Sequence, residues 1–302
     1  MKRIALALTA GIAATTLLTA CGSNTPTEPA AAATPGGYAD VNGLHMYYER
    51  HGVPTDQPPL VLLHGALSGI DTDFGQLIPE LAKTREVIAV EQQAHGRTAD
   101  IDRPLRTPQM AEDTVALLHQ IGVQRADILG YSMGSAVALE ITLKHPELVR
   151  KQVLLSGGLG VDGMHPGVMD GIKELRPEHL HGSPFHTDYL TNAPRPQDFP
   201  QLVSRVIDFD MNPAPTVQPE TVRTITAPTL TIIGDSDIVR PEHAVEMFRH
   251  FGGGIMGDTP EGLPNAQLAI LPGTSHITAP HHPELLLPMI PAFLDAPVKN
   301  AR

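Results

Sequence analysis

The sequence is poor in aromatic and charged residues. Its 302 residues include no tryptophan, 4% aromatic residues and only 18% charged residues. This scarcity argues against a binding surface built on aromatic stacking. The formal net charge is -12, and no run of lysine and arginine follows the first three residues. Because nucleic-acid-binding surfaces carry a basic patch or stripe, we predict no nucleic-acid partner.

A single cysteine, Cys21, excludes an internal disulfide bond. It is preceded by the basic residues Lys2 and Arg3 and by a mostly apolar run from Ile4 to Leu18. This run is too short to cross a membrane comfortably, and it is typical of the apolar region of a signal peptide.

The segment Leu18-Thr19-Ala20-Cys21 resembles the lipobox of bacterial lipoproteins. The resemblance implies cleavage before Cys21 and attachment of a diacylglycerol to its thiol. We therefore expect residues 1–20 to be a signal peptide, and the protein to be exported and anchored to a bacterial membrane by its lipid. An ordinary cleaved signal peptide and an uncleaved N-terminal anchor are the alternatives.

Residues 21–37 are rich in alanine, proline and glycine and have no core-forming period, so we predict a flexible tether. A hairpin from Val41 to Arg50 with a turn at Asn42-Gly43 follows. Short apolar runs then recur without alternation, as expected for parallel strands that are covered on both faces. These runs are Leu60–Leu63, Val87–Val90, Ala126–Leu129, Val153–Leu155, Thr229–Ile233 and Leu268–Leu271.

Segments with helical features separate these runs: Thr107–Ile121, Ser135–Lys144, Pro241–Phe251 and Glu284–Leu294, the last kinked or divided by Pro288 and Pro291. Repeated strand–helix units predict an α/β fold with a mostly parallel, doubly wound sheet. Residues 38–157 and 223–297 form its core. Residues 158–222 interrupt this alternation of strands and helices and contain many prolines, glycines and histidines. We predict that they form an inserted cap over the carboxyl ends of the strands.

The strongest motif is Gly130-Tyr131-Ser132-Met133-Gly134, which fits the Gly-x-Ser-x-Gly nucleophile elbow. An apolar strand precedes it and a helix follows it, so the motif stands in the required context. Flanking glycines permit a tight turn that exposes the serine hydroxyl. The backbone N–H of Met133, at the start of the helix, then faces developing negative charge.

Downstream, a strand ends in the acids Asp235 and Asp237, and His276 follows the last strand. The order serine, acid, histidine is the one expected for the α/β-hydrolase superfamily, and the chain resembles its capped, esterase-like members over residues 38–297. A serine hydroxyl needs a base to become a good nucleophile, and a histidine oriented by an acid supplies one.

The resemblance assigns the site residues. It implies a catalytic triad of Ser132, His276 and Asp237, with Asp237 preferred over Asp235 by the family pattern Gly-x-x-Asp. It also implies an oxyanion hole made by the backbone N–H groups of Ala66 and Met133. We interpret the side chain of His64, in the dipeptide before Ala66, as structural. Two positions depart from the pattern: Ala94 and Ser135 stand where glycine is common.

We therefore expect hydrolysis of a small or medium carboxylic ester, lactone or thioester through an acyl-serine intermediate. The predicted partners are a small-molecule acyl substrate and the membrane, through lipidated Cys21. We predict no cofactor and no metal site, because the cap histidines at positions 165, 179, 181 and 186 lack a tight ligand pattern. Apolar cap residues are expected to line the substrate pocket: Met164, Met169, Phe185, Tyr189 and Phe199.

Three alternatives stay open. Carbon–carbon bond hydrolases and cofactor-free perhydrolases use the same triad on this fold. A surface lipoprotein that has kept the fold only as a binding module is the non-enzymatic alternative. The sequence makes no prediction of oligomeric state.

Overall fold

The computed structural model describes residues 34–260 and 262–298. Its first elements form an antiparallel hairpin, β1 (Thr34–Val41) and β2 (Leu44–His51). Asn42 and Gly43 form the predicted turn, and both have positive φ angles, of 49° and 84°, as a tight hairpin turn requires. The predicted boundary of the tether at residue 37 was wrong, because backbone pairing with β2 begins at Thr34. This part of β1 contains Gly36 and Gly37, which have no side chains and therefore give no alternating pattern that would predict a strand.

Eight strands form one sheet in the order β1-β2-β4-β3-β5-β6-β7-β8. The strands after the hairpin are β3 (Leu60–Leu63), β4 (Val87–Val90), β5 (Ala126–Tyr131), β6 (Val149–Leu155), β7 (Thr229–Ser236) and β8 (Ala266–Ser275). In this order, all pairs from β4 to β8 are parallel, and the pairs β1–β2 and β2–β4 are antiparallel. The predicted fold class is confirmed.

The side chains of the central strands alternate between two hydrophobic cores. In β3, Val61 and Leu63 pack into one core, and Leu60 and Leu62 pack into the other. All four side chains are fully buried. A strand covered on both faces has no polar face, so its sequence is apolar throughout.

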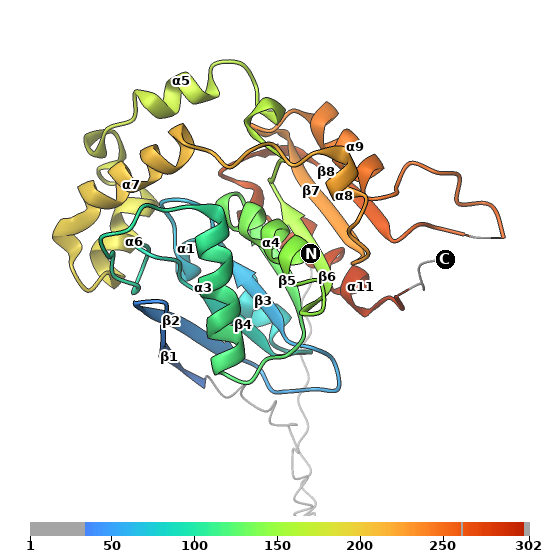
Figure 1. The fold of residues 1–302 in the computed structure, drawn as a ribbon, viewed down its shortest axis with the longest axis horizontal. Helices are drawn as coiled ribbons and strands as arrows, with labels where there is room; N and C mark the ends of the chain where they lie inside the picture. Colours follow the sequence, from blue (N-terminus) through green and yellow to red (C-terminus); the bar gives the residue numbers. More distant parts are fainter. Residues whose placement is uncertain (1–33, 261, 299–302) are drawn as a thin grey trace, which may run out of the picture. The chain divides into compact units, whose positions relative to one another are not determined.

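Helices cover both faces of the sheet. The first core receives side chains from α3 (Thr107–Gln120), α4 (Met133–Lys144) and α9 (Pro241–His250), and the second from α1 (Ile70–Phe74), α2 (Ile78–Leu81), α10 (Pro283–Leu286) and α11 (Ile290–Asp295). In Figure 1, α3 and α4 lie in front of the sheet. The predicted C-terminal helix is divided at its prolines, as the sequence required.

Between β6 and β7 the chain forms helical segments: η1 (Val161–Gly163), α5 (Val168–Lys173), η2 (Pro177–Leu180), α6 (Pro184–Asn192), η3 (Pro196–Asp198), α7 (Phe199–Met211) and α8 (Pro219–Val222). Figure 1 shows α5, α6 and α7 grouped beyond one end of the sheet. The face of α7 that carries Leu202, Val203 and Val206 is buried. This segment covers the site described below.

Within the described residues, no helix has the length and apolarity needed to span a membrane. The predicted signal peptide, residues 1–20, and the predicted lipid attachment site, Cys21, lie outside those residues. Export and lipid anchoring therefore stay predictions.

Candidate active site

Ser132 occupies the sharp turn between β5 and α4, at the carboxyl end of a central strand. Its backbone has φ 52° and ψ −115°, a strained conformation for a residue other than glycine. A hydrogen bond from the Ser132 amide to the Leu155 carbonyl (3.0 Å) ties the turn to β6. Ser132 lines a cavity at this edge of the sheet. In open parallel sheets, ligands bind at this edge.

Close backbone packing requires glycine at both glycine positions of the motif. A Cβ atom on Gly130 would lie 2.1 Å from the carbonyl oxygen of Gly134. A Cβ atom on Gly134 would lie 2.0 Å from the carbonyl oxygen of Leu63. The glycines therefore let α4 begin directly against the ends of β3 and β5.

Three side chains from three separate loops meet at this turn. The Oγ atom of Ser132 lies 2.9 Å from Nε2 of His276, and Nδ1 of His276 lies 2.7 Å from Oδ1 of Asp237. When Nδ1 carries the ring proton and donates it to Asp237, Nε2 can accept the proton of the serine hydroxyl. The structure thus joins the three predicted triad residues in one hydrogen-bonded chain.

Asp237 is buried and fully hydrogen-bonded. Its carboxylate accepts hydrogen bonds from the Ser156 hydroxyl (2.6 Å) and the Val239 amide (3.1 Å), besides that from His276. Burial alone would raise the pKa of Asp237, but these hydrogen bonds and the charge of His276 hold the pKa below its usual value. The carboxylate is therefore ionised at neutral pH and keeps His276 oriented.

Asp235 has a different position. It is exposed, and its carboxylate accepts hydrogen bonds from the amides of Gly273 (2.9 Å) and Thr274 (3.2 Å). These bonds hold the loop that leads to His276, without contact between Asp235 and the imidazole. The structure therefore gives the two acids different partners, as the predicted preference for Asp237 implies.

The amides of Ala66 and Met133 both border the cavity beside Ser132. Among the described residues, neither amide nitrogen donates a hydrogen bond. Met133 is the first residue of α4, where backbone N–H groups have no partner within the helix. Two free N–H groups beside a nucleophile are the arrangement that stabilises an oxyanion.

Buried polar residues hold the turn before Ala66. The carboxylate of Asp73 accepts hydrogen bonds from the Gly65 amide (2.8 Å) and the Ser68 hydroxyl (2.5 Å). His64 is fully buried, with Nδ1 2.7 Å from the Gly65 carbonyl and Nε2 accepting from the Gln92 amide at 3.0 Å. Burial lowers the pKa of His64 to about 4, so the ring is neutral and structural.

The cavity above Ser132 has a volume of about 580 Å³ and is lined mainly by apolar side chains. Of the five cap residues expected there, Met164 and Phe185 line it. Tyr189 and Phe199 do not line it, because their rings pack against each other in the core, 5.5 Å apart. Met169 is also absent from the lining. Other cap residues take these places, including Leu175, Leu180 and Phe209.

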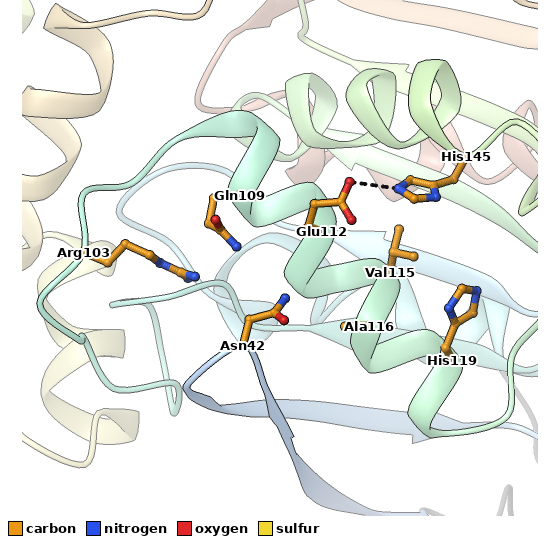
Figure 2. Close-up of a pocket in the computed structure, with 8 residues that line it drawn as sticks. All are labelled: Asn42, Arg103, Gln109, Glu112, Val115, Ala116, His119 and His145. Atoms are coloured by element: carbon orange, nitrogen blue, oxygen red, sulfur yellow. Dashed lines mark hydrogen bonds and ion pairs between the residues drawn. The ribbon is translucent and has the colours of Figure 1, made fainter.

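A second hollow is lined by side chains of α3 together with Asn42, Arg103 and His145 (Figure 2). It shares no lining residue with the cavity. Its polar side chains bind one another: Glu112 pairs with His145 at 3.0 Å, and Arg103 pairs with the buried Asp113 at 2.5 Å. These pairs have an evident structural role, and the hollow contains no candidate nucleophile.

Three residues near the triad were not predicted: Asp73, Ser156 and Asp210. Ser156 directly follows β6, so its place at the carboxyl end of a parallel strand could have indicated it. Asp210 follows Val203 and Val206 along the apolar face of α7, and an acid on such a face is a detectable signal. Asp73 has no comparable sequence signal.

Comparisons with known proteins agree with this fold. The family model described as "alpha/beta hydrolase fold" matches residues 58–180, which include Ser132 but neither Asp237 nor His276. The "Uncharacterized hydrolase YugF" of Bacillus subtilis (strain 168) is 26% identical over 274 residues, which cover 84% of this chain and 96% of that protein.

Two solved structures share the fold. The enol-lactonase from Burkholderia xenovorans LB400 superposes with a TM-score of 0.63 at 17% identity, covering 86% of this chain and 100% of that one. The 2-hydroxy-6-oxo-6-phenylhexa-2,4-dienoate hydrolase from Rhodococcus sp. strain RHA1 has a TM-score of 0.66 at 19% identity, covering 86% and 98%.

Proposed function

We propose that this chain, an enzyme with the α/β-hydrolase fold, hydrolyses a small or medium carboxylic ester through an acyl intermediate on Ser132. The observation that carries the proposal is the hydrogen-bonded chain from Ser132 through His276 to Asp237, at 2.9 Å and 2.7 Å. Lactones and thioesters undergo the same acyl transfer and belong to the same substrate class.

The reaction has two halves. His276 takes the proton of Ser132 as Oγ attacks the carbonyl carbon, and the amides of Ala66 and Met133 bind the resulting oxyanion. His276 then gives the proton to the departing alcohol oxygen, which leaves an ester on Ser132. A water molecule, deprotonated by His276, attacks this ester and releases the carboxylic acid, and the proton returns to Ser132.

The charge of the cavity favours ester hydrolysis over carbon–carbon bond cleavage of an acid. The Rhodococcus dienoate hydrolase acts, by its title, on a substrate that carries a carboxylate. Here no lysine or arginine stands among the described residues that line the cavity, whereas Glu140 and Asp210 do. Two carboxylates without a cation disfavour an anionic substrate.

Hydrolysis of p-nitrophenyl acetate, butyrate and octanoate by the full chain tests the proposal. We expect activity in the wild type and a loss of about 10⁴-fold or more in kcat for Ser132→Ala. Ser204→Ala is the matched control, because Ser204 is an exposed serine of α7 outside the cavity. A fluorophosphonate should label Ser132 in the wild type. Equal activity in the wild type and Ser132→Ala would contradict the proposal.

We also propose export and lipid attachment at Cys21, on the strength of the segment Leu18–Cys21. A bacterial host fed an alkyne-tagged fatty acid should place the tag on the wild-type chain, which should sediment with membranes. Cys21→Ser should carry no tag. An untagged wild-type protein in the soluble fraction would overturn this part of the proposal.

A further inference from the structure

The cavity above Ser132 has an uneven distribution of charge. Its lining is mostly apolar, and its ionisable side chains are Tyr131, Glu140, Asp210 and His276. His276 is engaged with Ser132 and Asp237. The described lining therefore offers carboxylates to a substrate and no lysine or arginine to balance them.

Asp210 has no hydrogen-bond or salt-bridge partner among the described residues, although it is partly buried and lies close enough to His276 to interact with it electrostatically. Asp208, two positions earlier on α7, differs: it pairs with Arg106 at 2.9 Å and accepts from Asn212 Nδ2 at 2.9 Å. The same helix thus holds one carboxylate with protein partners outside the cavity and one without such partners at the cavity wall.

A partly buried carboxylate that receives no hydrogen bond from the protein is less well solvated than one in bulk water. Leu159, Val206 and Phe209 line the same cavity, and they can contact an aliphatic chain but cannot bind a charge. A substrate that carries a positive charge would supply a partner for Asp210. A neutral substrate would displace water from Asp210 without forming a replacement interaction with its charge.

We propose that Asp210 binds an ammonium group of the substrate, so that the preferred esters are cationic. The proposal rests on ester hydrolysis at Ser132 and adds the substrate class. Asp210 acts as a specificity-determining residue on the cap, in the cavity that also contains Ser132. The apolar lining would enclose the carbon chain between the ammonium group and the ester.

Two isosteric pairs of esters test this proposal on either side of the scissile bond. On the acyl side, phenyl 6-aminohexanoate is compared with phenyl heptanoate. On the alcohol side, butanoylcholine is compared with 3,3-dimethylbutyl butanoate. The readout is the ratio of kcat/KM for the cationic and the neutral member of each pair. We expect the wild type to prefer the cationic member of at least one pair.

In Asp210→Asn, that ratio should fall by about 10- to 100-fold, the range expected for the loss of a charged hydrogen-bonded contact. Asp208→Asn is the matched control and should keep the wild-type ratio. Thermal unfolding of both variants shows whether the cap stays folded. If both pairs give the same ratios in the wild type and in Asp210→Asn, Asp210 does not select a cation.

A binding measurement separates this proposal from the proposed reaction. In the Ser132→Ala background, isothermal titration calorimetry with phenyl 6-aminohexanoate and with butanoylcholine needs no turnover. We expect the additional change Asp210→Asn to weaken binding of at least one of them about 10-fold or more. Equal affinities would refute the role of Asp210. Neutral esters hydrolysed through Ser132 without a cation preference would leave the hydrolase proposal intact and refute only this one.

Discussion

The buried carboxylate of Asp237 accepts a hydrogen bond from His276, with Oδ1 2.7 Å from Nδ1. Asp235, two residues earlier at the end of β7, has no contact with the imidazole. The two acids therefore form a matched pair for mutation. The charge and size of the change are the same in each, but only Asp237 contacts His276.

Asp237→Asn should lower kcat by about 10³- to 10⁴-fold, because an amide does not hold the imidazole in the required tautomer or stabilise the imidazolium. Asp235→Asn should keep kcat within about one order of magnitude, since its carboxylate only holds the loop of Gly273 and Thr274. Steady-state kinetics on p-nitrophenyl butyrate compares them. Similar losses in the two variants would mean that Asp237 has no special role.

Asp73 is expected to position the amide of Ala66. Burial raises the pKa of Asp73 to about 7, although hydrogen bonds from Ser68 and Gly65 lower it. A neutral side chain that can accept these bonds should therefore serve. Asp73→Asn should retain most activity, and Asp73→Ala should lower kcat about 10- to 100-fold with a smaller effect on KM, because the turn that carries an oxyanion donor shifts.

The comparison of Asp73→Ala with Asp73→Asn distinguishes positioning from bulk stability. Thermal unfolding of both variants reports the loss of the buried contacts. If Asp73→Ala is less stable but turns over at the wild-type kcat, the residue supports the fold and does not position Ala66.

Much of the sheet was predictable from local chemistry. The runs Leu60–Leu63 and Val87–Val90 lack a polar face because alternate side chains enter opposite cores. The motif around Ser132 was predictable because Gly130 and Gly134 leave no room for a Cβ atom. Both signals lie within a few residues, where the physical constraint is strongest.

The contents of the cavity were less predictable, because they depend on how helices and loops pack. Tyr189 and Phe199 are aromatic, as Phe185 is. Only Phe185 lines the cavity, because the rings of the other two pack together in the core. Asp73 reaches Gly65 from a helix eight residues further along the chain. Such contacts depend on tertiary packing, which short sequence patterns do not predict.

Gly134→Ala should destabilise the protein by about 3 kcal/mol or more, because the added Cβ atom would lie 2.0 Å from the Leu63 carbonyl oxygen and cannot rotate away. Gly171→Ala is the matched control: its Cβ atom has nothing within 4 Å, in the exposed helix α5. That change should be neutral or stabilise by about 0.5–1 kcal/mol. Denaturant unfolding measures both. A Gly134→Ala protein of wild-type stability would show that α4 can move away from β3.

The cation preference assigned to Asp210 should depend on pH. Burial raises the pKa of Asp210 to about 6, with an opposing effect from the charge of His276. The carboxylate is neutral below that pH and charged above it, so the kcat/KM ratio of cationic to neutral esters should rise as the pH increases through about 6.

The ratio isolates Asp210 from the other titratable groups that line the cavity, Tyr131, Glu140 and His276. Protonation of His276 slows both members of a pair alike, because both esters need the same base, and it therefore cancels in the ratio. In Asp210→Asn the ratio should be flat across this range, while Glu140→Gln should keep the rise. If the rise of the kcat/KM ratio with pH persists in Asp210→Asn and disappears in Glu140→Gln, the cation site belongs to Glu140 on α4 and not to Asp210 on the cap.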